Sequence, residues 1–253
     1  MGLFDKKFCD ICGGKIGMLG NRKLDDGNCC KDCAKQLSPF FSERRRSTVA
    51  DIKEQLAYRE QNKAAVAAFN TTRTLGITTK VFLDEDASKF AVSSAKRLAD
   101  ENTDILDFTQ VTGCNVEIKE SSKELKRKLP DGKEVSFVPP KYCYTFEHFI
   151  IVHVNSPWFN EIRFPISKSI DVETTGPRTT TVSSVEIGRK SNEYRQAEAL
   201  GNEIKTALTK VRQDVRAGVA AANAPKVAKT CPQCNATCIP DAQGCCEYCG
   251  GVM

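Results

Sequence analysis

Eight cysteines of this chain fall into two sets of paired CxxC units, one near the start and one at the end. The front set pairs CDIC with CKDC, and the rear set pairs CPQC with CEYC. Two residues between thiolates allow a tight turn to aim both sulfurs at one metal ion about 2.3 Å away, and a second such turn completes a tetrahedron. The spacing therefore predicts two zinc ions, with these ligands: Cys9, Cys12, Cys30, Cys33, Cys231, Cys234, Cys246 and Cys249.

A disulfide framework is the alternative explanation of these cysteines. The chain has 13 cysteines, an odd number, so they cannot all pair internally. The segment MGLFDKKFCD lacks the apolar run of a signal peptide, and no stretch approaches the roughly 18 apolar residues of a membrane span. We therefore expect reduced thiols and a cytoplasmic location. Four thiolates leave no coordination position open for water, so we expect structural rather than catalytic zinc.

The two zinc modules are predicted to differ. In the front module, Gly13 and Gly14 follow the first CxxC and supply the positive φ that a knuckle needs, whereas the residues after the second read as the start of a helix. This combination indicates a treble-clef-like module. In the rear module, Asn235 and Gly250 follow the two CxxC units, and both types tolerate the left-handed conformation. Two knuckles without a helix predict a small zinc ribbon.

Three further cysteines compete with the predicted ligands. Cys29 is adjacent to Cys30, Cys245 is adjacent to Cys246, and Cys238 lies four residues after the CPQC unit. The CxxC spacing favours Cys30 and Cys246. We interpret the spare thiols as packing residues, because free cysteine usually behaves as a buried hydrophobe.

Residues 47–70 are predicted to form a connector helix. Thr48 and Asp51 have the spacing of a capping box at its start. Ile52 and Leu56 give the helix one apolar stripe, and Val66 with Phe69 gives a weaker continuation. The preceding run of three arginines, at positions 44–46, is interpreted as a solvated cluster.

The middle of the chain is β-rich. Its clearest strand, residues 142–154, has apolar side chains on both faces at its centre, because Phe149 and Ile151 alternate with the main stripe. That pattern predicts a strand inside a sandwich or barrel. A turn at residues 155–157 and the segment FNEIRFPI predict a hairpin. The main stripe consists of Tyr142, Tyr144, Phe146, His148, Ile150, Val152 and Val154.

An amphipathic helix is predicted from about Asn192 to Val215, with Ser191 as its cap. Strands followed by one C-terminal helix resemble a pleckstrin-homology-like (PH-like) domain, and a generic sandwich or half-barrel is the alternative. The overall fold class is therefore α+β multidomain. The predicted buried stripe of this helix consists of Ala197, Leu200, Ile204, Leu208, Val211 and Val215.

Five segments follow from these patterns. The alanine-rich stretch AGVAAANAPKVAKT is predicted to be a flexible linker, and the rear ribbon after it is too short to bury a core without metal. The segments are a zinc module (1–40), a connector helix (41–74), a PH-like domain (75–216), a linker (217–230) and a zinc ribbon (231–253).

Charge argues against nucleic acid as the main partner. The net charge is +5, but two tetrathiolate zinc sites would lower it to about +1. Residues 231–253 contain no lysine or arginine and carry Asp241 and Glu247. The rear ribbon should therefore be repelled by phosphate. The arginines at 44–46 and the LKRK run at 125–128 keep nucleic acid open as an alternative.

Motifs for catalysis are sparse. The two histidines, His148 and His153, lie on opposite faces of one predicted strand, and the sequence contains no HExxH, GxxxxGK[ST] or GxSxG. Cys114 and Cys143 are expected to pack inside the β domain. We expect a protein that is not an enzyme.

The two ends of the chain resemble known zinc modules. FCDICGGKIG, CCKDC and STVADIKEQL together resemble the N-terminal zinc-binding domain of an uncharacterised bacterial family, a domain of unknown function. CPQCNATCIPDAQGCCEYCGG resembles C-terminal zinc ribbons of bacterial membrane-associated and adaptor proteins, although Asn235 replaces their usual glycine and Cys238 and Cys245 are additional. The resemblance implies a cytoplasmic protein of bacteria or phages and no particular activity.

These observations favour an adaptor or scaffold that acts through protein–protein interaction, because zinc pre-organises short loops for binding. Peripheral membrane attachment through the PH-like domain or the start MGLFDKKF is a further alternative, although charged residues interrupt that start. The identity of the partner and the oligomeric state stay open.

Overall fold

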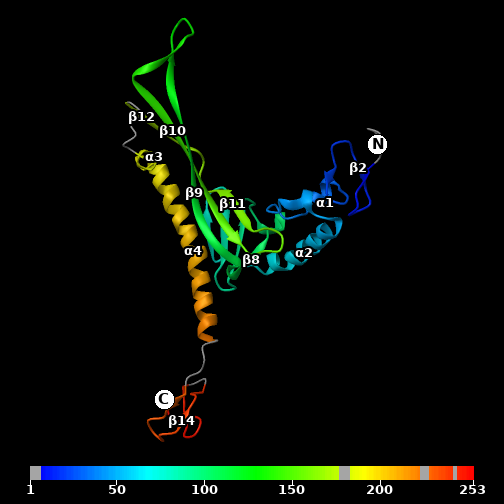
Figure 1. Ribbon diagram of the computed structural model, residues 1–253, viewed down its shortest axis with the longest axis vertical. Helices are drawn as coiled ribbons and strands as arrows, with labels where there is room; N and C mark the ends of the chain where they lie inside the picture. Colours follow the sequence, from blue (N-terminus) through cyan, green and yellow to red (C-terminus); the bar gives the residue numbers. More distant parts are fainter. Residues whose placement is uncertain (1–6, 177–182, 223–227, 242–243) are drawn as a thin grey trace. The chain divides into compact units, whose positions relative to one another are not determined.

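The computed structural model describes residues 7–176, 183–222, 228–241 and 244–253. Its chain divides into two compact units, residues 1–212 and residues 213–253 (Figure 1). The first unit holds the front cysteines and all the long strands, and the second holds the rear cysteines. No helix among the described residues is long and apolar enough to cross a membrane.

Short paired strands and a one-turn helix build the front module. β1 pairs antiparallel with β2, and β3 pairs antiparallel with β4. A small apolar core that includes Leu24, Leu37 and Ile52 lies beneath them. The elements are β1 (Lys7–Phe8), β2 (Lys15–Ile16), β3 (Arg22–Lys23), β4 (Asn28–Cys29), α1 (Lys31–Lys35) and the 3₁₀ helix η1 (Glu43–Arg46).

Helix α2 (Val49–Ala68) begins where the capping box predicts. The Thr48 hydroxyl accepts from the Asp51 N–H, and the Asp51 carboxylate accepts from the Thr48 N–H. Ile52 is fully buried and Leu56 half-buried, which confirms the apolar stripe at the start of the helix.

Further along α2, the buried side chains are polar. Arg59 and Asn62 are 5% exposed and contact the 3₁₀ helix η2 (Leu98–Glu101) and the residues after it. Arg59 Nη1 donates to Asp104 Oδ1 at 2.7 Å, and the Ser38 hydroxyl donates to the other carboxylate oxygen. These bonds attach the front module to the β domain, which the sequence did not indicate. We call Arg59, Asn62, Ser38 and Asp104 the polar seam.

Four consecutive antiparallel strands form the first sheet, in the order β5-β6-β7-β8. Their bounds are β5 (Arg73–Gly76), β6 (Lys80–Asp84), β7 (Lys89–Ser93) and β8 (Ile105–Asp107), followed by the 3₁₀ helix η3 (Phe108–Gln110).

The second sheet is organised around β10. β9 pairs along one edge of β10, while β11 and β12 pair with successive parts of the other edge. The hairpin predicted from the turn at residues 155–157 is confirmed as the β10–β11 connection. The bounds are β9 (Val111–Lys128), β10 (Glu134–Val154), β11 (Glu161–Pro165) and β12 (Ile170–Thr175).

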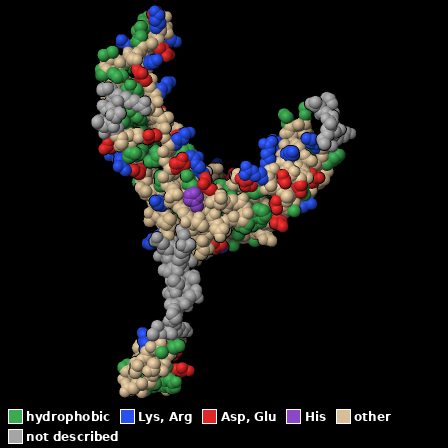
Figure 2. All heavy atoms as spheres, in the orientation of Figure 1, with side chains coloured by type: hydrophobic (Ala, Val, Ile, Leu, Met, Phe, Trp, Pro, Cys, Tyr) green, Lys and Arg blue, Asp and Glu red, His purple; other side chains and the backbone are tan. Residues whose placement is uncertain are grey.

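The β9–β10 hairpin extends past the end of β12 (Figure 1). Beyond the Lys141–Thr175 pair, β12 no longer pairs with β10, so only two strands continue. Lys and Arg side chains gather at the far end of this hairpin (Figure 2). The predicted strand at residues 142–154 is the second part of β10, which begins at Glu134 and continues through Pro139 and Pro140 with a shift in register between Ser136 and Lys141.

Helix α4 (Asn192–Ala222), preceded by α3 (Ser184–Gly188), packs into the core that the two sheets share. Ile204 and Leu208 are fully buried, and the Ser191 hydroxyl accepts from the Tyr194 N–H as the predicted cap. The side chains of Val211 and Val215 lie outside the described residues. The helix continues to Ala222 into the predicted linker, because alanine is the strongest helix former.

Both sheets are open, and the prediction that β10 is covered on both faces is wrong. His148, Ile150 and Val152 are buried on one face, as predicted. On the other face Phe149 is only half-buried, and the Arg163 guanidinium lies 3.8 Å from the centre of its ring. The alkyl chain and guanidinium of Arg163 cover the Phe149 ring, so no further layer of protein is needed on that face of the sheet.

The second unit contains one short hairpin, β13 (Lys229–Thr230) with β14 (Thr237–Cys238), and an isolated bridge between Cys245 and Val252. Its buried cluster consists of Cys231, Cys238 and Cys246, with Met253 packed against them. Among its described side chains, the unit therefore has almost no apolar core apart from the cysteines.

Candidate metal centres

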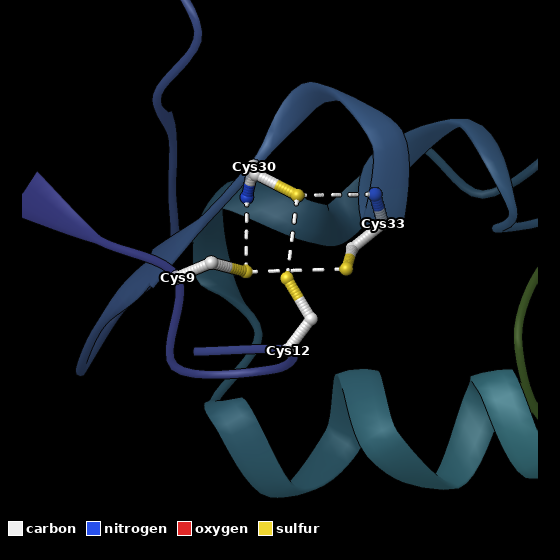
Figure 3. A group of neighbouring side chains, drawn as sticks. All are labelled: Cys9, Cys12, Cys30 and Cys33. Atoms are coloured by element: carbon white, nitrogen blue, oxygen red, sulfur yellow. Dashed lines mark hydrogen bonds between the residues drawn. The ribbon is translucent and has the colours of Figure 1, made fainter. Parts of the chain in front are cut away.

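The four front cysteines predicted as ligands point toward one centre (Figure 3). Their sulfurs all lie within 4.8 Å of one another. The Cys9 and Cys33 sulfurs are 3.9 Å apart, and the Cys12 and Cys30 sulfurs are 3.8 Å apart. The rear cysteines form a second such group, in which the Cys231–Cys249 and Cys234–Cys246 sulfur distances are 3.6 and 3.7 Å.

These distances fit a tetrahedral metal ion. Zinc binds thiolate at about 2.3 Å, so the sulfurs of a regular Zn–S₄ tetrahedron lie about 3.8 Å apart. They are much longer than the roughly 2.04 Å of a disulfide bond, and all 13 cysteines are free thiols in the structure. Each group can hold one metal ion through four thiolates.

Three of the four CxxC units share one backbone arrangement. In each, the N–H of the first cysteine donates to the carbonyl five residues later, and the residue four positions on donates back to the first cysteine's carbonyl. The returning residues are Gly13, Asn235 and Gly250, whose φ values are 72°, 56° and 72°. These values confirm the predicted left-handed positions. Each turn directs its two sulfurs to the same side.

The fourth unit is different because Cys30 caps a helix. The Cys30 sulfur accepts from the Cys33 N–H at 3.3 Å, and the helix α1 follows directly. The Cys30 N–H in turn donates to the Cys9 sulfur at 3.2 Å. The predicted helix after the second front CxxC is therefore present, and it begins at Lys31, inside that unit.

Backbone N–H groups favour a thiolate in each group. Although burial raises the pKa of Cys9, N–H groups of Cys12, Cys30 and Ile11 outweigh it and lower that pKa to about 6. In the rear group the pKa of Cys246 is likewise about 6: burial raises it, and the N–H groups of Cys249 and Tyr248 lower it. One sulfur in each quartet is thus ready to bind a cation at neutral pH.

The spare cysteines are placed as the CxxC spacing predicts. Cys29 is fully buried in the front core, and burial raises its pKa to about 12. Cys238 is also buried, and its sulfur lies 3.5 Å from that of Cys246. Cys245 N–H donates to the Asp241 carboxylate. The two groups of four cysteines whose sulfurs all lie within 4.8 Å of one another contain Cys30 and Cys246.

The remaining candidates from the sequence are separate from one another. His148 is fully buried in the core, whereas the side chain of His153 is 41% exposed beside Glu161 on the opposite face. Cys114 is buried as predicted. Cys143 is only half-buried on the outer face of β10, so its predicted place inside the domain is wrong.

Part of the chain matches a known protein family. A family described as a domain of unknown function (DUF4428) matches residues 7–55. The matched segment contains the front quartet and the first turn of α2 with its capping box. No curated protein matches the chain. The front module is therefore similar to this domain, which confirms the resemblance seen at that end of the sequence.

Proposed function

We propose that the protein is a non-enzymatic adaptor that binds other proteins and contains two structural zinc ions. The observation that carries the proposal is the sulfur spacing of the two quartets, 3.6–3.9 Å, which suits closed tetrahedral coordination. Four thiolates saturate such an ion, so its contribution is to fold the loops that carry them. Thiolate ligands need a reducing compartment, so we place the protein in the cytoplasm.

The β9–β10 hairpin supplies a surface that fits a protein partner. Among the described strands β9 pairs only with β10, so beyond Gly113 no described strand lies along its outer edge. Such an open edge can take up an extended segment of another chain as an added strand. A two-stranded ribbon is marginally stable alone, so a partner would also order its end.

We also propose that residues 75–216 have a PH-like architecture, with a treble-clef-like module before them and a ribbon after them. Four antiparallel strands, β5 to β8, are followed by β9 to β12, in which β10 pairs with the other three strands, and then by α3 and α4. Ile204 and Leu208 of α4 enter the core between the sheets, as the closing helix of such a domain would. Superposition of an experimental structure on known PH-like domains tests this assignment.

Nucleic acid is a second candidate partner, because the hairpin end is basic. Between Leu125 and Lys141 the chain has five basic residues and two acidic ones, Asp131 and Glu134. A two-stranded ribbon of this kind can enter the major groove of DNA. The acidic rear module argues against a large nucleic-acid footprint, so protein remains the preferred partner.

Native mass spectrometry of the full-length protein tests the metal sites. The wild type is expected to hold two zinc ions, one for each quartet. Cys246→Ser should hold one, whereas the matched variant Cys238→Ser should keep two, because Cys238 lies next to the quartet without belonging to it. Retention of two ions by Cys246→Ser would contradict the ligand assignment.

Affinity capture with zinc-loaded protein then tests the function. After nuclease treatment, the wild type should retain a defined protein, and charge reversal of Lys126, Arg127 and Lys128 should not abolish capture. If nuclease removes all binding, and a defined DNA or RNA binds with a steep salt dependence that the charge reversal eliminates, the nucleic-acid function is correct instead.

A further inference from the structure

The loop between β2 and β3 exposes two large apolar side chains at the corner of a tight turn. The Gly20 N–H donates to the Gly17 carbonyl at 3.0 Å, which places Met18 and Leu19 at the two central positions. Their exposed fractions are 96% and 89%. Such positions usually carry Gly, Pro, Asn, Asp or Ser, which need no burial. We call Met18 and Leu19 the apolar tip.

Basic residues occupy the strands that lead into and out of this turn. Arg22 Nη1 donates to the Leu19 carbonyl at 3.2 Å, so its guanidinium lies beside the turn. Lys15 precedes the turn by two residues and is exposed, as is Lys23. Arg44 of η1 donates to the Lys23 carbonyl and adds a fourth positive charge. We call Lys15, Arg22, Lys23 and Arg44 the basic collar.

The collar has no acidic counterpart at the turn. Residues 11–24 contain no Asp or Glu, and within the described part of the chain no ion pair involves a member of the collar. Two acidic side chains of the module are instead occupied on its other elements. Asp10 accepts from the Asn28 N–H at 2.6 Å, and Asp26 accepts from the Val49 N–H at 2.7 Å. Residues 11–24, which include the turn, therefore carry only positive charges.

We propose that the apolar tip and basic collar form a docking surface for an anionic lipid bilayer. The tip projects from a turn, and a projecting pair of flexible side chains suits insertion into a fluid interface. The collar lies behind the tip, where it would meet acidic headgroups as the tip enters the acyl boundary. The apolar tip suits the acyl layer and the basic collar suits acidic headgroups, so an anionic lipid surface is the partner that fits both. The proposal does not depend on the adaptor function.

Co-sedimentation of the zinc-loaded, full-length protein with vesicles tests this surface. At low salt the wild type should pellet with phosphatidylcholine vesicles that contain about 30 mol% phosphatidylserine, and binding should weaken as salt rises. Vesicles of phosphatidylcholine alone should bind much less. The double variant Met18→Ser/Leu19→Ser should bind the anionic vesicles at least about tenfold more weakly, because two inserted apolar side chains are lost.

Matched variants distinguish binding through this surface from non-specific binding to vesicles. Val138→Ser removes a side chain that is 94% exposed on the hairpin, and it should leave vesicle binding unchanged. Lys15→Gln/Lys23→Gln should weaken binding, whereas Lys133→Gln on the hairpin should not. Native mass spectra with two zinc ions per chain show that each variant is folded.

Two results would overturn the proposal. One is a wild type that stays in the supernatant with anionic vesicles at low salt. The other is a Met18→Ser/Leu19→Ser variant that pellets as well as the wild type. If vesicles fail to bind but the double variant loses a captured protein, the tip is a protein contact and the lipid assignment is wrong. Loss of vesicle binding with capture intact leaves the adaptor function untouched.

Discussion

Replacing Arg59 with methionine tests how the front module is held on the β domain. The Arg59 side chain is 6% exposed and that of Asp104 is fully buried, at an N–O distance of 2.7 Å. Arg59 also donates to the carbonyls of Gln36 and Glu101, each at 3.1 Å. Methionine keeps the length of the side chain but removes all three hydrogen bonds. Asp104 then has only the Ser38 hydroxyl as a side-chain partner.

The expected cost of Arg59→Met is large. Breaking a buried ion pair by removing one partner typically lowers the free energy of unfolding by about 3–5 kcal/mol, because the other charge stays buried. The double variant Arg59→Met/Asp104→Leu removes both charges and should recover much of that loss. Arg73→Met is the matched control. Its pair with Glu203 is also 2.7 Å long but is 41–49% exposed, so its loss should cost less than about 1 kcal/mol.

The single tryptophan provides the assay. Trp158 is the only tryptophan in the chain, and it lies between the front module and the sheets. Its ring centre is 6.5 Å from that of Phe41 and 6.3 Å from that of Tyr58 on α2. Its fluorescence during urea unfolding therefore reports on this junction. The argument is refuted if Arg59→Met costs no more than Arg73→Met, or if the double variant is no more stable than Arg59→Met.

The same variant has a pH signature. Burial already raises the pKa of the Asp104 carboxyl, although Arg59 and Ser38 oppose the shift. Without Arg59 the pKa of Asp104 rises further, and the folded variant takes up a proton that the unfolded chain, with an Asp pKa of about 3.9, does not. Stability should therefore be lost as the pH rises through the folded pKa. Arg59→Met should be less destabilising at about pH 5 than at about pH 7.

Three smaller predictions concern other parts of the fold. Burial lowers the pKa of His148, so the unfolded chain takes up a proton first as the pH falls, and the free energy of unfolding should decrease at pH values below about 6.5. His148→Phe should reduce this decrease, measured as the urea midpoint, and an unchanged pH slope would contradict the prediction. Gly188→Ala places a methyl group against the Tyr194 ring and should cost about 1–3 kcal/mol in urea unfolding, whereas Gly17→Ala meets no atom within 4 Å and should be nearly neutral. Thr48→Ala removes the α2 cap and should cost about 1 kcal/mol, measured in the same way; a neutral result would show that Asp51 is sufficient.

The CxxC turns and the capping box were predicted well because the interactions that form them involve only residues close together in the sequence. Each CxxC unit needs only two thiols and a residue that accepts positive φ, so Gly13, Asn235 and Gly250 could be assigned before any tertiary structure was known. The capping box of Thr48 and Asp51 is contained in four residues. For the same reason the choice of Cys30 and Cys246 over their neighbours followed from spacing alone.

The polar seam could not be predicted because its partners are distant in sequence. Gln55, Arg59 and Asn62 continue the helical spacing of Ile52, and all four are buried. Polar side chains at such positions normally indicate a solvated face. Only the chain around Asp104, more than 40 residues away, makes that face internal. The available signal in the sequence was a stripe of polar residues that continues the apolar stripe of the helix at the same spacing.

Strand boundaries were missed for a different reason. Proline is rarely found in the middle of a strand, and Pro139 and Pro140 lie just before the predicted strand at residues 142–154. In the structure they occupy the irregularity at which the register shifts, and the pairing resumes at Lys141. The outer face of β10 was misjudged because Phe149 is covered by one arginine, a pairing that depends on the register of β11.

The two quartets should depend on metal to different degrees, although their sulfur geometry is the same. The front module shares its core with Ile52 of α2, and α2 is fixed to the sheets through Arg59 and Asp104. The buried cluster described in the rear module consists of three cysteines, with Met253 packed against them. Metal binding of about 10–16 kcal/mol, the range for comparable zinc peptides, then provides nearly all of the rear module's folding energy. At the front, the same ion mainly fixes the positions of loops on a scaffold that has its own core. The loop that carries Met18 and Leu19 is one of these, so its orientation on the domain depends on both the metal and the seam.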